Sequence, residues 1–122
     1  MRSLVICNTC KFSLESKFAP DGRTGGQILI DHVRQALVDR TDVDVVEQAC
    51  MWNCVRPCSV VIRDDERYSY ITGGNAPTRD QAEAILTWFD SHGESATGEV
   101  PFKQWPQAMR GHFIARIPPV AK

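Results

Sequence analysis

The hydrophobic positions at the start of the chain predict a strand followed by a helix. Residues 2–7 are almost continuously apolar, which is typical of a central strand covered on both faces. After a polar loop, residues 24–27 (TGGQ) have the spacing of a capping box that opens a helix. Ile30, Val33 and Leu37 then form its apolar stripe.

The middle of the chain predicts a second strand, a hairpin and a second helix. The valines of residues 43–46 indicate a strand that runs into Cys50, and residues 59–63 and 67–72 indicate two strands joined by a polar connection. A second capping box, residues 78–81 (TRDQ), opens a helix that we expect to end at Gly93. Its apolar face carries four side chains at helical spacing: Ala82, Ile85, Leu86 and Phe89.

The order of these elements predicts a small α/β domain with a thioredoxin-like plan. Its mixed sheet is expected to be parallel in the first crossover and antiparallel in a hairpin towards the C-terminal side, with flanking helices. Residues 99–122 form a tail with four prolines that is too apolar for a disordered end. We therefore expect residues 1–122 to be a single domain, whose tail packs back on the domain or onto a partner, including a second copy of the chain.

Length and charge exclude several classes of function. A chain of 122 residues can bury a core without disulfides to hold it together. Its formal net charge of −1, with acids and bases interleaved, lacks the electrostatic footprint of a nucleic-acid-binding protein. The apolar run at the start is too short for a signal peptide or a membrane span, so we expect no membrane association and a cytoplasmic location. A phosphate loop, a dinucleotide fingerprint and a serine elbow are all absent from the sequence.

Five cysteines in two groups are the main chemical feature of the chain. Cys7 and Cys10 form a CxxC pair, and Cys50, Cys54 and Cys58 form a CxxxCxxxC run. An odd number of cysteines argues against a fully paired disulfide framework, and a reducing cytoplasm leaves thiols available for metal. Two groups that each deliver two thiolates fit one tetrathiolate site, either for zinc or for an iron–sulfur cluster.

The spacing suggests an order of preference among the five thiols. Cys7, Cys50 and Cys54 come first as ligands, and Cys10 is the fourth. Cys58 is the alternative to Cys10 or Cys50, or else a buried thiol beside the centre, because it opens an apolar strand.

Two other interpretations stay open at this point. One is a structural zinc site in an adaptor protein without a redox role. The other is a thiol–disulfide oxidoreductase built on the CxxC pair. A catalytic dithiol normally opens a helix, whose N-terminus lowers the thiol pKa, whereas residues 11–22 have the pattern of a loop.

The cysteine run and the strands after it resemble a known family. Residues 50–62, followed by an aromatic strand at residues 68–70 and a capped helix, resemble the thioredoxin-like 2Fe-2S ferredoxins and the small iron–sulfur subunit of respiratory NADH dehydrogenase. The resemblance implies a 2Fe-2S cluster held by Cys7, Cys50 and Cys54, with Cys10 as the fourth ligand. This chain has Cys58 where those ferredoxins typically have proline, and its first two cysteines are closer together than theirs.

A second resemblance covers nearly the whole chain. The two cysteine groups and the ending, from residues 98–101 (GEVP) to residues 115–119 (ARIPP), are similar to a bacterial family of predicted metal-binding proteins of unknown function. Members of that family are often associated with cobalamin metabolism. Together the two resemblances imply a one-electron carrier rather than an enzyme, with a reductase as its redox partner.

Overall fold

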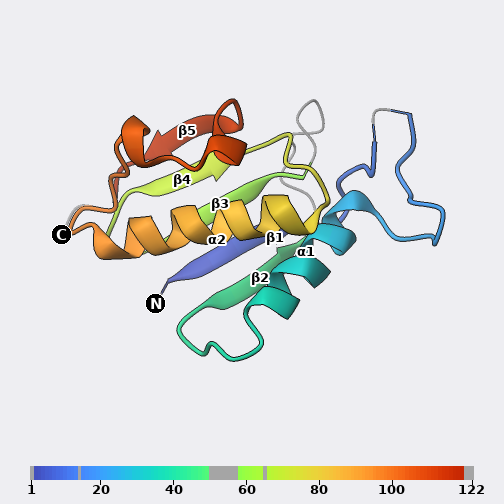
Figure 1. Cartoon of the computed structure of the whole chain (residues 1–122), viewed down its shortest axis with the longest axis horizontal. Coiled ribbons are helices and arrows are strands. Elements are labelled where there is room, and N and C mark those ends of the chain that lie inside the picture. Colours follow the sequence, from blue (N-terminus) through green and yellow to red (C-terminus); the bar gives the residue numbers. More distant parts are fainter. Residues whose placement is uncertain (1, 14, 50–57, 65, 120–122) are drawn as a thin grey trace.

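A five-stranded mixed sheet with two helices on one of its faces forms the computed structural model of the chain (Figure 1). The structure describes residues 2–13, 15–49, 58–64 and 66–119. The strands lie in the order β2-β1-β3-β4-β5. Their bounds are β1 Ser3–Cys7, β2 Asp44–Gln48, β3 Val60–Arg63, β4 Ser69–Thr72 and β5 Phe113–Ile117, and those of the helices are α1 Gly25–Ala36 and α2 Arg79–Glu94.

Strand β1 lies between a parallel and an antiparallel neighbour. It pairs in parallel with β2 through the crossover that contains α1, and antiparallel with β3. Strands β3 and β4 form the antiparallel hairpin. The predicted α/β class, with a parallel first crossover and an antiparallel hairpin, is therefore confirmed, and the strand order is compatible with a small thioredoxin-like fold.

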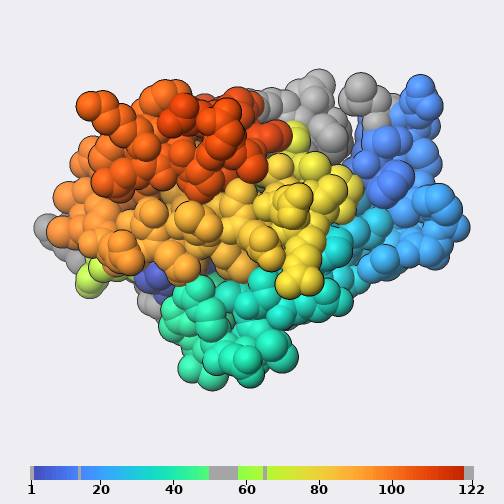
Figure 2. Space-filling view, in the orientation of Figure 1, coloured from blue at the N-terminus to red at the C-terminus, as the bar shows by residue number. Residues whose placement is uncertain are grey.

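The main core fills the space between the sheet and the two helices. Alternate residues of the strands point to this side, so Leu4 and Ile6 are fully buried in the core whereas Val5 lies outside it. In the space-filling view of the helical face, α2 crosses the middle with the tail on one side and α1 on the other (Figure 2). Burial of each large apolar side chain contributes about 1.5–3 kcal/mol. The largest of these side chains in the core are Trp88, Tyr70, Phe89, Leu4, Ile6, Leu29, Ile62 and Ile85.

The predicted capping box at the start of α1 is present. The Thr24 hydroxyl accepts a hydrogen bond from the Gln27 amide at 3.1 Å, and the Gln27 side-chain oxygen accepts one from the Thr24 amide at 2.9 Å. These bonds satisfy two amides that a helix N-terminus otherwise leaves without partners. The helix therefore begins where the pattern placed it.

The second helix differs from its prediction at both ends. Thr78 caps α2 by accepting from the Gln81 amide at 3.2 Å, but the Gln81 side chain turns inward, so only half of the predicted capping box forms. The prediction that Gly93 ends the helix is wrong, because α2 continues to Glu94. Gly93 has a different role: a Cβ there would lie 2.3 Å from the guanidinium of Arg2, which packs across the helix.

The tail packs onto its own domain. After two 3-10 helices, η1 Phe102–Gln104 and η2 Gln107–Met109, it adds β5 to the sheet beside β4. Trp105 stacks on Trp88 with 4.9 Å between ring centroids, and its indole N–H donates to the Val100 carbonyl at 2.8 Å. Residues 99–119 therefore pack back on the domain, as one of the two expectations for the tail had it. No helix within the described ranges is long and apolar enough to cross a membrane.

A buried histidine sits near the end of α2, on the side of Arg2. The Nε2 atom of His92 lies 2.6 Å from the Tyr68 carbonyl oxygen, so Nε2 carries the proton and donates. The Nδ1 atom faces Nη2 of Arg2 at 3.3 Å and accepts. Burial lowers the pKa of His92, the charge of Arg2 lowers it further, and the Tyr68 carbonyl opposes the shift.

We expect the free energy of unfolding to decrease as the pH falls from 7 to 5. In the unfolded chain the imidazole of His92 binds a proton near its ordinary pKa of about 6.5, whereas in the folded protein its pKa is lower. Below pH 6.5 the unfolded state therefore holds more protons than the folded state. Above that pH the contribution of His92 to the free energy of unfolding does not change with pH. Urea denaturation between pH 5 and 8 measures the slope, which His92→Gln should reduce and the control Gln35→Ala, at an exposed residue that does not titrate, should retain. An unchanged slope in His92→Gln would contradict this assignment.

Candidate metal centre

Three cysteines from both sequence groups meet at one end of the sheet. Cys7 is the last residue of β1, Cys10 lies in the loop that follows, and Cys58 comes shortly before β3. Because β1 and β3 are antiparallel neighbours, the end of β1 faces the beginning of β3. The Cys7 amide accordingly donates to the Ser59 carbonyl at 3.2 Å. Strand pairing therefore joins the CxxC pair to the last cysteine of the CxxxCxxxC run.

Cys10 is the thiol at the centre of this group. Its pKa depends on interactions with the thiols of both Cys7 and Cys58. The Cys58 sulfur also lies 3.7 Å from the carbonyl oxygen of Lys11, and the Cys7 sulfur lies 3.6 Å from the hydroxyl of Thr9. Cys58 and Cys7 are 1% and 4% exposed, whereas Cys10 is partly exposed. All three are free thiols.

The thiol group concentrates its negative charge on one sulfur. The hydrogen bond from Cys58 lowers the pKa of Cys10 to about 5, with a further contribution from Cys7, and burial opposes the shift. The same hydrogen bond, together with burial, raises the pKa of Cys58, and burial raises the pKa of Cys7. Of the three thiols, Cys10 is therefore the one whose surroundings favour the thiolate form.

Cys50 and Cys54, which the sequence ranked first with Cys7, lie outside the described residues. The described residues on either side of positions 50–57 are Ala49 and Cys58, and both lie beside the CxxC loop. The Ala49 carbonyl accepts from the Thr9 hydroxyl and lies 3.9 Å from the Cys7 sulfur, on the β2 side of β1. Cys58 approaches Cys10 on the β3 side. Both ends of the stretch are thus held against the CxxC loop.

The three described thiols do not make a complete metal site. Within the described ranges, no group of three or more His, Cys, Asp or Glu side chains is placed to hold a metal ion. A tetrathiolate centre at this position therefore requires donors from residues 50–57, where Cys50 and Cys54 are the candidates.

The start of α1 packs directly against the CxxC loop. The Gly26 amide donates to the Cys10 carbonyl at 3.3 Å, and the Thr24 hydroxyl donates to the Asn8 carbonyl at 2.6 Å. An added Cβ at Gly26 would lie 2.0 Å from the Cys7 carbonyl oxygen. The glycine that weakens the helix pattern is therefore required for close approach of two backbones. The helix fixes the loop that carries Cys10.

Asn75 is a site residue that sequence analysis missed. This buried side chain donates to the carbonyl oxygen of Cys58 at 2.9 Å. Cys58 has a φ of 59°, a left-handed backbone conformation that is uncommon outside glycine. In the sequence, Asn75 follows two glycines in a segment with the composition of an ordinary turn, so no local pattern distinguishes it.

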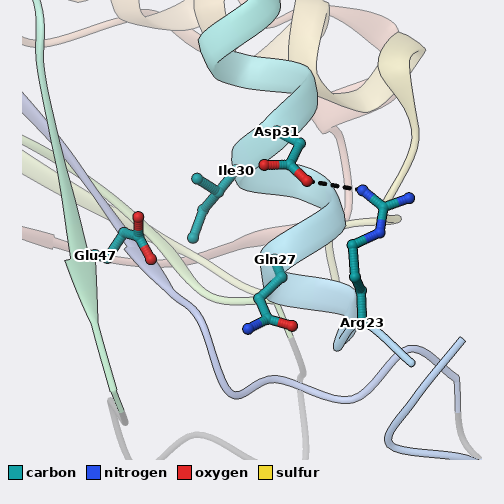
Figure 3. A pocket seen from close by; sticks show the side chains of 5 residues that line it. All are labelled: Arg23, Gln27, Ile30, Asp31 and Glu47. Carbon is teal, nitrogen blue, oxygen red and sulfur yellow. Dashed lines mark hydrogen bonds and ion pairs between the residues drawn. The ribbon is translucent and has the colours of Figure 1, made fainter. Parts of the chain in front are cut away.

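A polar pocket of about 300 Å³ opens between α1 and β2, close to the loop after β1 (Figure 3). Its charged side chains are already paired. Arg23 binds Asp31 at 2.7 Å across the pocket mouth, and Glu47 binds Arg34 at 3.1 Å. The Asn8 amide donates to Glu47 at 3.2 Å, which links the pocket wall to the CxxC loop. The pocket contains no thiol among its lining residues, which are Arg23, Gln27, Ile30, Asp31 and Glu47.

Comparison with known proteins identifies the family. No curated protein and no solved structure matches the chain. The model of one family, described as a protein of unknown function (DUF1636), matches residues 4–119. That description names neither a cofactor nor a pathway, so the resemblance to 2Fe-2S ferredoxins stays a prediction. Because the match extends over nearly the whole chain, the protein belongs to the DUF1636 family.

Proposed function

We propose that the chain is a one-electron carrier that holds a 2Fe-2S cluster on cysteine thiolates at the end of β1. The observation that carries the proposal is the meeting of Cys7 and Cys10 with Cys58 at one end of the sheet. The two cysteine groups are far apart in the sequence, and only the pairing of β1 with β3 joins them. Packing alone does not explain three free thiols near one another at that point.

The charges at the thiol group favour a metal over a simple dithiol. The pKa of Cys10 is lowered mainly by hydrogen bonds from thiols and backbone amides. Around Cys58, burial and the neighbouring thiols raise the pKa. A second and third thiolate at this position would therefore need a cation to become stable. Metal ions supply that positive charge and keep coordinating thiols deprotonated.

Five cysteines are candidates for four ligand positions. Cys7, Cys10 and Cys58 are the described candidates, and Cys50 and Cys54 belong to the stretch whose two flanks are held at the site. When bound, a 2Fe-2S cluster takes up and releases one electron without binding a substrate at the metal. Burial of Cys7 and Cys58 keeps water from the inner side of the centre, while partly exposed Cys10 gives it an edge towards solvent.

The surface beside Cys10 suits an acidic redox partner. Lys11 and Lys17 are exposed in the loop that follows Cys10, and neither has a carboxylate partner among the described residues. Lys17 lies 5.7 Å from the ring centroid of Phe18, which is 52% exposed. Exposed charges next to a redox centre increase the association rate of a partner with opposite charge. We propose a reductase as this partner.

The proposed carrier works in the cytoplasm, where a reducing thiol pool keeps cysteines available for cluster assembly. The resemblance that covers nearly the whole chain supports a role in cobalamin metabolism. Neither nucleic acid nor a membrane surface takes part in the proposed function.

Purification in air followed by a visible spectrum tests the proposal. We expect a brown-red protein whose charge-transfer absorption bleaches with dithionite, and whose iron and acid-labile sulfide are equimolar. A colourless protein that contains zinc would overturn the proposal in favour of a structural zinc adaptor. A colourless, metal-free protein whose thiols exchange with small disulfides would favour a dithiol oxidoreductase.

A further inference from the structure

One face of the sheet is covered by neither α1 nor α2. Both helices lie on the opposite face, with the core between them and the sheet (Figure 1). Successive side chains of a strand point to opposite faces, so the residues that alternate with Leu4 and Ile6 of the core lie on the uncovered face. We call this the outer face. A sheet face in contact with water normally carries polar side chains.

An aliphatic row crosses the outer face at the middle of every strand. Val5 of β1 pairs with Val46 of β2 on one side and with Val61 of β3 on the other. The register continues from Val61 to Ile71 of β4, and from Ile71 to Ala115 of β5. Residues paired in this way have neighbouring side chains on the same face. None of these five residues, which we call the aliphatic row, is part of the core under the helices.

Much of the aliphatic row is accessible to solvent. Four of its five members are partly exposed, whereas Val5 in the central strand is 7% exposed. Ile117, which pairs with Ser69 on the same face, is 47% exposed and enlarges the apolar surface at the β5 edge. Valine and isoleucine suit strands in general, so a single outward pair would carry no argument. A continuous row across five strands is an apolar patch of the kind that a protein partner covers.

Two charges of opposite sign lie beside the aliphatic row, one on each side of β1. Asp44 of β2 and Arg63 of β3 both pair with Ser3, so they share the outer face. Both are exposed, and neither has an ion-pair partner among the residues that the structure describes. Arg63 donates from Nε to the Ser3 hydroxyl at 3.3 Å. Two strand spacings of about 4.8 Å separate the backbones of Asp44 and Arg63, so both charges are available to a partner.

We propose that the outer face binds a second copy of the chain, about a two-fold axis parallel to β1. Rotation about that axis exchanges the two sides of β1, so Asp44 of each copy faces Arg63 of the other. The same rotation places Val46 against Val61 and brings the two Val5 side chains together. Opposite charges at equal distances from β1 make the face complementary to itself, which favours a second copy over an unrelated protein.

The outer face is small for a dimer interface. Five strands of four or five residues make a surface of about 20 by 15 Å, whereas a typical stable complex buries roughly 800 Å² on each partner. We therefore expect a weak dimer, in which two sheets pack face to face and which dissociates on dilution. Because exposed charges contribute to it, added salt should weaken it further.

Sedimentation equilibrium of the full-length protein at increasing concentration tests the charge pairs. We expect Asp44→Arg and Arg63→Asp each to raise the dissociation constant of the dimer at least about 10-fold, because each places two like charges opposite each other. A mixture of the two variants should dimerise again, since one then carries two positive charges on the outer face and the other two negative charges. Asp39→Arg reverses an exposed charge in the loop between α1 and β2, and should sediment like the wild type.

A second pair of variants tests the aliphatic row. Val61→Glu places a charge in the middle of the row, where the second copy would bury it without a partner, so the dimer should be lost. Val38→Glu is the matched control, because Val38 is 79% exposed beyond the end of α1. It should dimerise like the wild type. If Val61→Glu does not fold, the charge reversals at exposed positions 44 and 63 still decide the question.

Three outcomes would overturn the inference. A wild-type protein that is monomeric at every concentration would show that the outer face does not bind a second copy. A dimer that tolerates both charge reversals would show that the copies meet elsewhere. Single variants that stay monomeric when mixed would show that Asp44 and Arg63 do not face each other. All three are separate from failure of the electron-carrier proposal, which is decided by the iron and sulfide content of the protein as isolated.

Discussion

Alanine at position 26 is expected to disrupt both the fold and the proposed metal centre. An added Cβ at Gly26 would lie 2.0 Å from the Cys7 carbonyl oxygen and 2.9 Å from the Asn8 Cα. Both are backbone atoms at or just after the end of β1, so relief requires α1 to move away from the CxxC loop. Overpacking of this kind costs about 1–3 kcal/mol, and occasionally more, and here it also displaces Cys10.

Urea denaturation and the iron content of the Gly26→Ala protein measure the two effects. Gln35→Ala is a suitable control, because it changes an exposed residue near the end of the same helix and should alter stability by less than about 0.5 kcal/mol. A Gly26→Ala protein as stable as the wild type would show that the helix does not approach the loop as closely as described.

Serine at position 10 is expected to abolish assembly of the proposed cluster. Cys10 lies in the loop between Cys7 and α1, and the thiols of Cys58 and Cys7 lower its pKa to about 5. A serine hydroxyl is nearly isosteric but does not ionise at neutral pH. Because Cys10 is partly exposed, the cost in fold stability should be small, so the loss would be specific to metal.

Iron, acid-labile sulfide and visible absorption of the isolated Cys10→Ser protein measure this loss. Thr9→Ser is the matched control: it changes the adjacent residue, keeps the hydroxyl near Cys7, and should retain the cluster. Wild-type iron and sulfide in Cys10→Ser would mean that the other four cysteines suffice, and that Cys10 is an ordinary neighbour of the centre.

Local pattern was sufficient for most elements of the fold. The apolar periods located both helices and four strands, because a helix or strand that buries one face repeats its side chains at a fixed spacing. The tail strand β5 was not specified by pattern. Its residues alternate weakly and lie among prolines, and what makes them a strand is the free edge of β4, which comes from a distant part of the chain.

The two wrong predictions for α2 also result from long-range contacts. Gln81 has the right position for a capping box, but Asn75 and the tail offer it buried partners that the helix N-terminus does not. Gly93 has the composition of a helix end, yet α2 continues past it, with the Arg2 guanidinium packed beside it. In both cases a tertiary neighbour determined what a local rule had assigned to the helix alone.

For the candidate centre, the sequence indicated which residues can bind a metal, and the structure shows which of them lie close together. Cysteine spacing identified which thiols can act as pairs, since that is a property of short loops. It could not show that Cys58 meets Cys10, because this depends on β1 lying beside β3. Nor could it mark Asn75, whose role is visible only in its hydrogen bond to Cys58.

The separation of Cys10, Cys58 and Asn75 along the chain limits when the proposed centre can assemble. Lys11, which follows Cys10, and Cys58 are 47 positions apart, and Asn75 comes another 17 positions later. A nascent chain on the ribosome thus exposes its CxxC pair well before the opposing thiol and its anchor have emerged. Under the proposed function, insertion of the cluster is therefore expected to follow translation of Asn75.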